Sequence, residues 1–248
     1  MAMTERRHDT SRAPVGEPAR ASAGKRALAW THTARFFVTA SKLDELPATE
    51  LPEIAFVGRS NAGKSSAINA LAQQRRLAFS SKTPGRTQHI NLFELGPKGQ
   101  PDAYFADLPG YGYAAVARQA KLRWQEVMAD YLAVRRNLGA IVVLVDARHG
   151  FTEIDRNLLS FIAPRVANGA VSLLALLTKV DKLSRNEARK ALDAAVVAMQ
   201  AVTTEQSNVA LVGFSILSGA GIEDTALRLR RIVHPCDPAC SDAADEPE

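Results

Sequence analysis

The chain has 248 residues, of which 46% are hydrophobic and 23% are charged, and its formal net charge is +5 at pH 7. These values are typical of a globular protein, and no stretch approaches the roughly 18 uninterrupted apolar residues of a membrane helix. Because there are only two cysteines, Cys236 and Cys240, a disulfide scaffold is excluded and a cytoplasmic location is expected.

Composition and charge divide the chain into a body and two tails. Residues 1–33 are rich in Ala, Arg, Ser, Gly and Pro without periodicity, which predicts a basic disordered arm. Residues 235–248 carry five acidic and no basic side chains, which predicts an acidic disordered tail. The domain between them, residues 34–234, is basic, which suits a nucleic-acid-rich partner; a basic surface without a specific partner is the alternative.

Six apolar runs with the length of strands follow one another along this domain. They are EIAFVG (53–58), HINLFEL (89–95), DAYFADLPG (102–110), GAIVVLVDA (139–147), AVSLLALLTKVD (170–181) and NVALVGFS (208–215). Because helical patterns alternate with them, we expect an α/β fold with a mostly parallel sheet and helices on both faces. The turn-rich GPKGQP between the second and third runs predicts a hairpin, and hence one antiparallel edge strand.

Three helices are predicted from local patterns. In residues 121–136 the apolar positions from Trp124 to Leu132 share one helical face. Ser184 and Glu187 have the spacing of a capping box, which predicts that a helix begins there. Residues 221–233 predict the last helix of the domain.

The stretch FVGRSNAGKSS (56–66) has the pattern G-x-x-x-x-G-K-[ST] between a predicted strand and a predicted helix. In such a phosphate-binding loop, Gly58 and Gly63 let the backbone wrap around the phosphates of a nucleotide. Lys64 is expected to contact the β- and γ-phosphates, and Ser65 to give its hydroxyl to Mg²⁺. A nucleotide-binding protein is therefore predicted, and a metabolic NTPase or nucleotide kinase is one possible kind.

Two further motifs indicate that the nucleotide is GTP. In DLPG (107–110), Asp107 can hold Mg²⁺ through a water and the Gly110 amide can meet a γ-phosphate. In TKVD (178–181), the Asp181 carboxylate can accept hydrogen bonds from N1–H and the amine of guanine, which adenine lacks. The stem of Lys179 can cover the base.

Two loops complete the expected site. FSILSG (214–219) follows the last strand, where the backbone of Ser215 and Ile216 can read the guanine O6. SSKTPGRTQH (80–89) lies where a switch loop belongs, and Thr87 is the candidate second Mg²⁺ ligand, with Thr83 as the alternative.

Four sequence motifs resemble those of the EngB/YihA (YsxC) family of ribosome-biogenesis GTP-binding proteins, in the TrmE-Era-EngA-EngB-septin-like class. They are GRSNAGKSS, KTPGRTQHIN, DLPGYGYA and TKVDKL. The resemblance covers about residues 34–233. It implies a Ras-like P-loop G domain with a six-stranded sheet and Mg²⁺-dependent GTP hydrolysis. It also implies a monomeric cytoplasmic switch whose partner is the large ribosomal subunit precursor, its rRNA and its proteins, with a link to cell division and septation.

The same resemblance implies which residues contact GTP. They are Gly58, Arg59, Ser60, Asn61, Ala62, Gly63, Lys64, Ser65, Ser66, Gly85, Arg86, Thr87, Gln88, His89, Asp107, Leu108, Pro109, Gly110, Thr178, Lys179, Val180, Asp181, Phe214, Ser215 and Ile216. Lys64, Thr87 and Gly110 would be catalytic. Ser65 and Thr87 would hold Mg²⁺, and Ile216 departs from the small residue usual in the family.

Two residues bear on the rate of hydrolysis. Ras-type switches place a water-orienting Gln after D-x-x-G, and here that position is Tyr111, which predicts slow hydrolysis without a partner. Asn61 is the candidate ligand of a K⁺ ion that would supply positive charge, and a residue suited to a tight turn is the alternative. A G domain that regulates another complex, such as a membrane transporter, is the other functional hypothesis.

Overall fold

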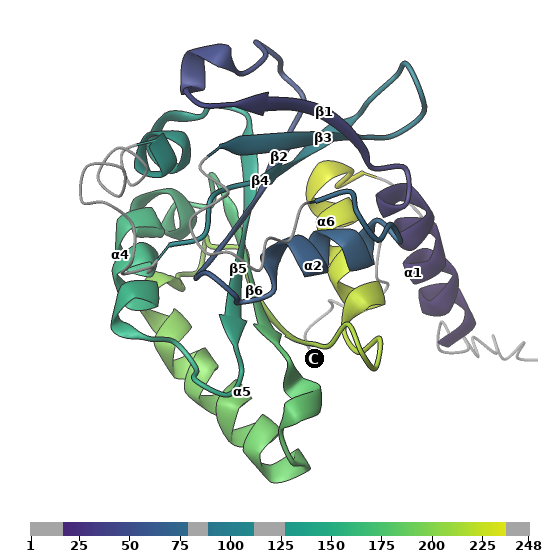
Figure 1. Ribbon diagram of the computed structural model, residues 1–248. Helices are drawn as coiled ribbons and strands as arrows, with labels where there is room; N and C mark the ends of the chain where they lie inside the picture. Colours follow the sequence, from purple (N-terminus) through teal and green to yellow (C-terminus); the bar gives the residue numbers. More distant parts are fainter. Residues whose placement is uncertain (1–16, 79–88, 112–126, 237–248) are drawn as a thin grey trace, which may run out of the picture.

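Seven strands form one mixed sheet at the centre of the computed structural model, which describes residues 17–78, 89–111 and 127–236 (Figure 1). Their order across the sheet is β1-β3-β4-β2-β5-β6-β7. The strands are β1 (Arg35–Ala40), β2 (Glu53–Gly58), β3 (Ile90–Leu95), β4 (Ala103–Asp107), β5 (Leu138–Asp146), β6 (Ser172–Thr178) and β7 (Val209–Phe214). The predicted α/β fold with a mostly parallel sheet is confirmed.

The edge of the sheet differs from the prediction. Strand β3 is antiparallel to β4, as predicted, but a seventh strand, β1, pairs antiparallel with its other side and forms the edge. The expectation of six strands with β3 at the edge is therefore wrong. Strand β1 has no alternating apolar pattern because an edge strand needs little burial: Phe36 and Phe37 are exposed, and the register shifts between Phe36 and Val38.

Strands β4, β2, β5, β6 and β7 are parallel, so their carboxyl ends meet at one edge of the sheet. Phe56 pairs with Asp107, Gly58 with Leu144, and Thr178 with both Asp146 and Phe214. Because ligands of such sheets bind beyond the carboxyl ends of the strands, this register decides which loops can act together.

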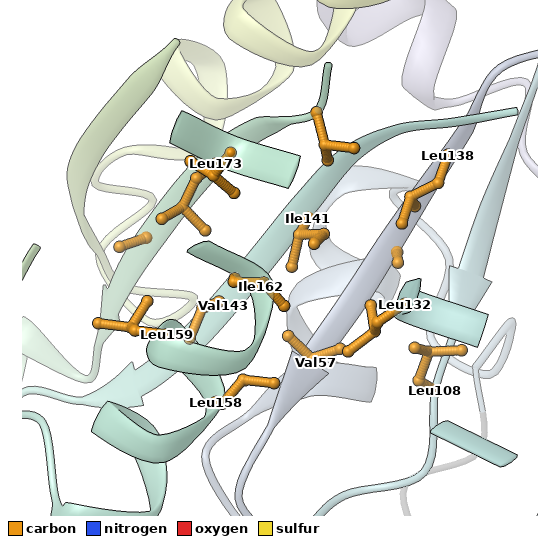
Figure 2. Close-up of a cluster of buried hydrophobic side chains, with 14 of the residues drawn as sticks. Val57, Leu108, Leu132, Leu138, Ile141, Val143, Leu158, Leu159, Ile162 and Leu173 are labelled. Carbon is orange, nitrogen blue, oxygen red and sulfur yellow. The ribbon is translucent and has the colours of Figure 1, made fainter. Parts of the chain in front are cut away.

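Helices cover both faces of the sheet (Figure 1). On one face, α4 (Glu153–Ala167) and α5 (Arg185–Met199) enclose a core that includes Val57, Ile141, Val143 and Ile162 (Figure 2). On the other face, α2 (Lys64–Leu71) and α6 (Ile222–Val233) enclose a second core. None of the helices in the described ranges combines the length and apolarity needed to cross a membrane.

The three helix predictions have different outcomes. Ser184 caps α5 and exchanges the two hydrogen bonds of the capping box with Glu187, and α6 covers the predicted last helix. Residues 127–134 are helical, with Leu132 buried in the core. Trp124 and the first part of that predicted helix lie outside the described residues.

The N-terminal prediction needs a correction. Residues 17–31 were expected to belong to a disordered arm, but they form helix α1 (Glu17–Thr31), which lies beside α6 (Figure 1). Its contacts come from small residues, Ala23 and Ala27, and from Trp30, which donates to Asp102 at 2.9 Å. A buried face made of alanines and one tryptophan gives no apolar periodicity, so the sequence pattern missed it.

A buried charged cluster lies at the opposite end of the sheet from the carboxyl edge. Glu53, at the start of β2, is completely buried. It accepts hydrogen bonds from Nη2 of Arg135 at 2.6 Å, from Nε of Arg135 at 3.0 Å and from the hydroxyl of Tyr131. Burial and the charge of Glu53 hold the pKa of Tyr131 well above 10.

We predict that Tyr131→Phe changes how stability depends on pH. At neutral pH the variant loses about 1–3 kcal/mol, because Glu53 loses one donor. Above pH 10 the unfolded wild-type Tyr131 ionises while the folded one keeps its proton, so wild-type stability falls by an additional contribution of about 1.4 kcal/mol per pH unit that Phe does not have. Urea unfolding between pH 8 and 11 measures both effects, and parallel pH curves for the two proteins would contradict the assignment.

Candidate nucleotide site

The phosphate-binding loop joins β2 to α2 at the carboxyl edge of the sheet. Gly63 has φ 98° and Asn61 has φ 68°, so both turn through the left-handed region that lets the chain double back. Gly58 passes close to β5, since a Cβ there would lie 2.9 Å from the carbonyl oxygen of Leu144. This tight course places Lys64 as the first residue of α2.

Lys64 and Asp107, predicted from separate motifs, form an ion pair between α2 and the end of β4. Lys64 is 8% exposed and Asp107 is 0% exposed, so each charge depends on the other for compensation. The hydroxyl of Ser65 lies 3.4 Å from Oδ2 of Asp107. A hydroxyl beside a carboxylate is an oxygen donor set that suits Mg²⁺.

Residues of the TKVD motif hold the phosphate-binding loop from the side of β6. The hydroxyl of Thr178 donates to the carbonyl of Ala62 at 2.7 Å, and Nζ of Lys179 donates to the carbonyl of Asn61 at 2.8 Å. Lys179 has φ 61°, a left-handed conformation that turns its stem back toward the loop. The structure therefore brings these two motifs into direct contact, as the sequence order predicts.

Asp181 is oriented by the loop after β7. Its Oδ1 accepts a hydrogen bond from the hydroxyl of Ser215 at 2.6 Å, and Nζ of Lys182 lies 3.6 Å from its other oxygen. The hydrogen bond from Ser215 is the main cause that lowers the pKa of Asp181 below its ordinary value. An ionised carboxylate is thus held at a fixed position at the end of the TKVD motif.

One site residue was not predicted from the sequence. Asp146, at the end of β5, accepts from Nζ of Lys179 at 2.8 Å and pairs with Arg148 at 2.7 Å. Burial raises its pKa, but the hydrogen bonds from Arg148 and Lys179 outweigh burial and lower the pKa overall. The sequence did contain a signal for Asp146, because it is an acidic residue at the carboxyl end of the apolar run GAIVVLVDA. Asp107 was predicted from the same kind of position.

The remaining predicted residues have different surroundings. Phe214 and Leu108 are completely buried in the two cores, whereas Ile216 is 48% exposed. A Cβ on Gly110 would lie 3.2 Å from the amide nitrogen of Ser60, so DLPG meets the phosphate-binding loop. Nδ1 of His89, just before β3, lies 2.9 Å from Oγ of Ser41.

Five of the predicted switch-loop residues fall in the range between α2 and β3 that the structure does not describe. Gly85, Arg86, Thr87 and Gln88, together with the alternative ligand Thr83, lie outside the described residues. Within the described ranges no group of three or more His, Cys, Asp or Glu side chains could hold a metal ion. Ser65 and Asp107 therefore remain the described part of the predicted Mg²⁺ site.

Comparisons with known proteins agree on a family. Residues 53–179 match the family described as 50S ribosome-binding GTPase. A probable GTP-binding protein EngB of Albidiferax ferrireducens is 57% identical over 213 residues, which cover 86% of this chain and 99% of that protein. Its counterpart in Polaromonas is 54% identical and covers 91% and 89%. A crystal structure of a probable GTP-binding protein EngB has the same fold, with a TM-score of 0.57, 21% identity, and coverage of 74% of this chain and 99% of that one.

We predict that Ser215→Ala raises the pKa of Asp181 toward the ordinary aspartate value, because the hydrogen bond from Ser215 is the largest cause of its lowering. An NMR titration of the side-chain carboxyl carbons measures this shift. Ser218→Ala is the matched control, since Ser218 contacts Ser215 through its backbone amide. An unchanged Asp181 pKa in Ser215→Ala would contradict the geometry.

Proposed function

This chain belongs to the EngB family of GTP-binding proteins, and we propose that it binds GTP and GDP and hydrolyses GTP slowly as a switch in large ribosomal subunit assembly. The observation that carries the proposal is that four predicted motifs contact one another at one sheet edge. Lys64 meets Asp107, Lys179 meets the phosphate-binding loop, and Ser215 orients Asp181.

Guanine recognition is assigned to Asp181. A carboxylate held by Ser215 accepts hydrogen bonds from N1–H and the exocyclic amine of guanine, whereas adenine would leave it unpaired. Lys179 lies with its ammonium between the carbonyl of Asn61 and the carboxylate of Asp146, which stretches its methylene stem beside the loop. That stem can then cover one face of the base.

Phosphate binding requires an exchange of partners. The ammonium of Lys64 would contact the phosphates in place of Asp107, and Asp107 and Ser65 would hold the hydrated Mg²⁺ that accompanies the nucleotide. When bound, Mg²⁺ neutralises charge on the phosphates. Thr87 remains the predicted second ligand.

Slow hydrolysis follows from the position of Tyr111. Its ring is buried and its hydroxyl donates to Asp155 at 2.8 Å, so it does not orient an attacking water as a glutamine would. Positioning of the water is therefore left to a partner or to another ion. Asn61 adopts the left-handed turn conformation, which supports its turn role, and the K⁺ hypothesis stays a prediction.

We predict that Asp181→Asn shifts nucleotide preference from GTP to XTP. Asparagine cannot accept two hydrogen bonds from guanine, so GTP affinity should fall by roughly a hundredfold or more while XTP affinity rises. Titration with fluorescent nucleotides measures both affinities. Asp193→Asn, an exposed acid on α5, is the matched control, and full GTP affinity in Asp181→Asn would refute the assignment.

The ribosomal part of the proposal predicts that the protein sediments with large subunits in a sucrose gradient when it carries a non-hydrolysable GTP analogue and not when it carries GDP. Lys64→Ala is the control, because loss of nucleotide should abolish the difference. If the wild-type protein migrates with large subunits in neither state, the switch is assigned to the wrong partner.

A further inference from the structure

The DLPG segment is joined to the phosphate-binding loop by backbone hydrogen bonds on both sides of Arg59. The amide of Tyr111 donates to the carbonyl of Gly58 at 3.1 Å, and the amide of Ser60 donates to the carbonyl of Tyr111 at 3.0 Å. Arg59 and Tyr111 thus form a parallel bridge beyond the ends of β2 and β4. The amide of Ser60 is therefore bonded to the carbonyl of Tyr111, and the ammonium of Lys64 is paired with the carboxylate of Asp107, so both groups have partners at or just beyond the end of β4.

The side chain of Tyr111 anchors this bridge to α4. Its hydroxyl donates to Oδ1 of Asp155, which is 1% exposed. The other oxygen of Asp155 accepts from the amide and the hydroxyl of Thr152 at 2.8 and 2.6 Å, so Asp155 is fixed in the capping box of α4. Burial and the neighbouring Asp155 raise the pKa of Tyr111, which keeps its hydroxyl as a donor.

Arg59 offers Asp155 a second partner. Arg59 and Asp155 line the same cavity of about 350 Å³ behind the phosphate-binding loop. Nε of Arg59 is buried and has no hydrogen-bond partner within the described part of the chain, which is costly for a guanidinium. The other acid that lines this cavity, Asp146, is already bonded to Arg148 and Lys179.

We propose that Asp155 exchanges the Tyr111 hydroxyl for the Arg59 guanidinium when a γ-phosphate takes the Gly110 amide and the backbone bonds between Tyr111 and the phosphate-binding loop break. The inference rests on the proposed function. Release of Tyr111 would leave a buried carboxylate oxygen without its donor, and Arg59, whose Nε has no hydrogen-bond partner among the described residues, lines the same cavity. Tyr111 therefore favours the joined state, and Arg59 favours the released one.

The two residues should shift nucleotide preference in opposite directions, because a ligand selects between two states only by its different affinity for them. Tyr111→Phe weakens the joined state and should raise the ratio of GTP-analogue affinity to GDP affinity. Arg59→Gln weakens the released state and should lower that ratio. Each shift should be on the order of tenfold, the usual weight of one hydrogen bond to a charged group.

Binding of a non-hydrolysable GTP analogue and of GDP to the full chain, measured by titration calorimetry, tests the proposal. Tyr131→Phe is the matched control, since it removes the same hydroxyl-to-carboxylate bond at the far end of the sheet and should leave the ratio unchanged. An unchanged ratio in Tyr111→Phe, or shifts of the same sign in Tyr111→Phe and Arg59→Gln, would overturn it. If the wild-type chain binds neither nucleotide, the proposed function fails and the exchange fails with it.

Discussion

A lysine ammonium buried at the start of α2 requires a negative partner, and Asp107 at the end of β4 supplies it. This requirement connects the elements around the site. The ammonium reaches Asp107 because β2 and β4 are parallel and in a register that pairs Phe56 with Asp107. Since a buried ion pair contributes little to stability in itself, its place at the sheet edge is better explained by ligand binding.

Buried charges at the two ends of the sheet are compensated in different ways. Glu53 accepts three hydrogen bonds from two residues, Tyr131 and Arg135, and Arg135 is further bonded to the carbonyl of Pro47. These bonds fix the start of β2. At the carboxyl edge, Lys64, Asp107 and the Ser60 amide are each satisfied by a group that the ligand can replace. A fixed start of β2 would support the exchange of partners that we propose at the carboxyl edge.

The sequence predicted the parts of this site that depend on local spacing. The phosphate-binding loop, DLPG and TKVD each follow a strand, so their order along the chain sufficed to place Lys64, Asp107 and Lys179 at one edge. The cap of α5 was likewise a matter of three-residue spacing. The elements that the sequence did not predict depend on long-range contacts. Strand β1 is defined by its pairing with β3, and α1 by its packing against α6, and neither contact produces a periodic apolar pattern in the sequence.

Tyr111 shows how the same limit applies to mechanism. Its place after D-x-x-G shows only that a glutamine is missing. Its hydroxyl, however, bonds to Asp155, which is 44 positions further along the chain, and this bond gives the side chain a structural role of its own. A buried hydroxyl that holds a loop backbone to a helix cap makes loop position depend on that helix. The residue on which we base the proposal of slow hydrolysis is thus also the contact through which we propose that α4 responds to the nucleotide, because both proposals follow from where one side chain is anchored.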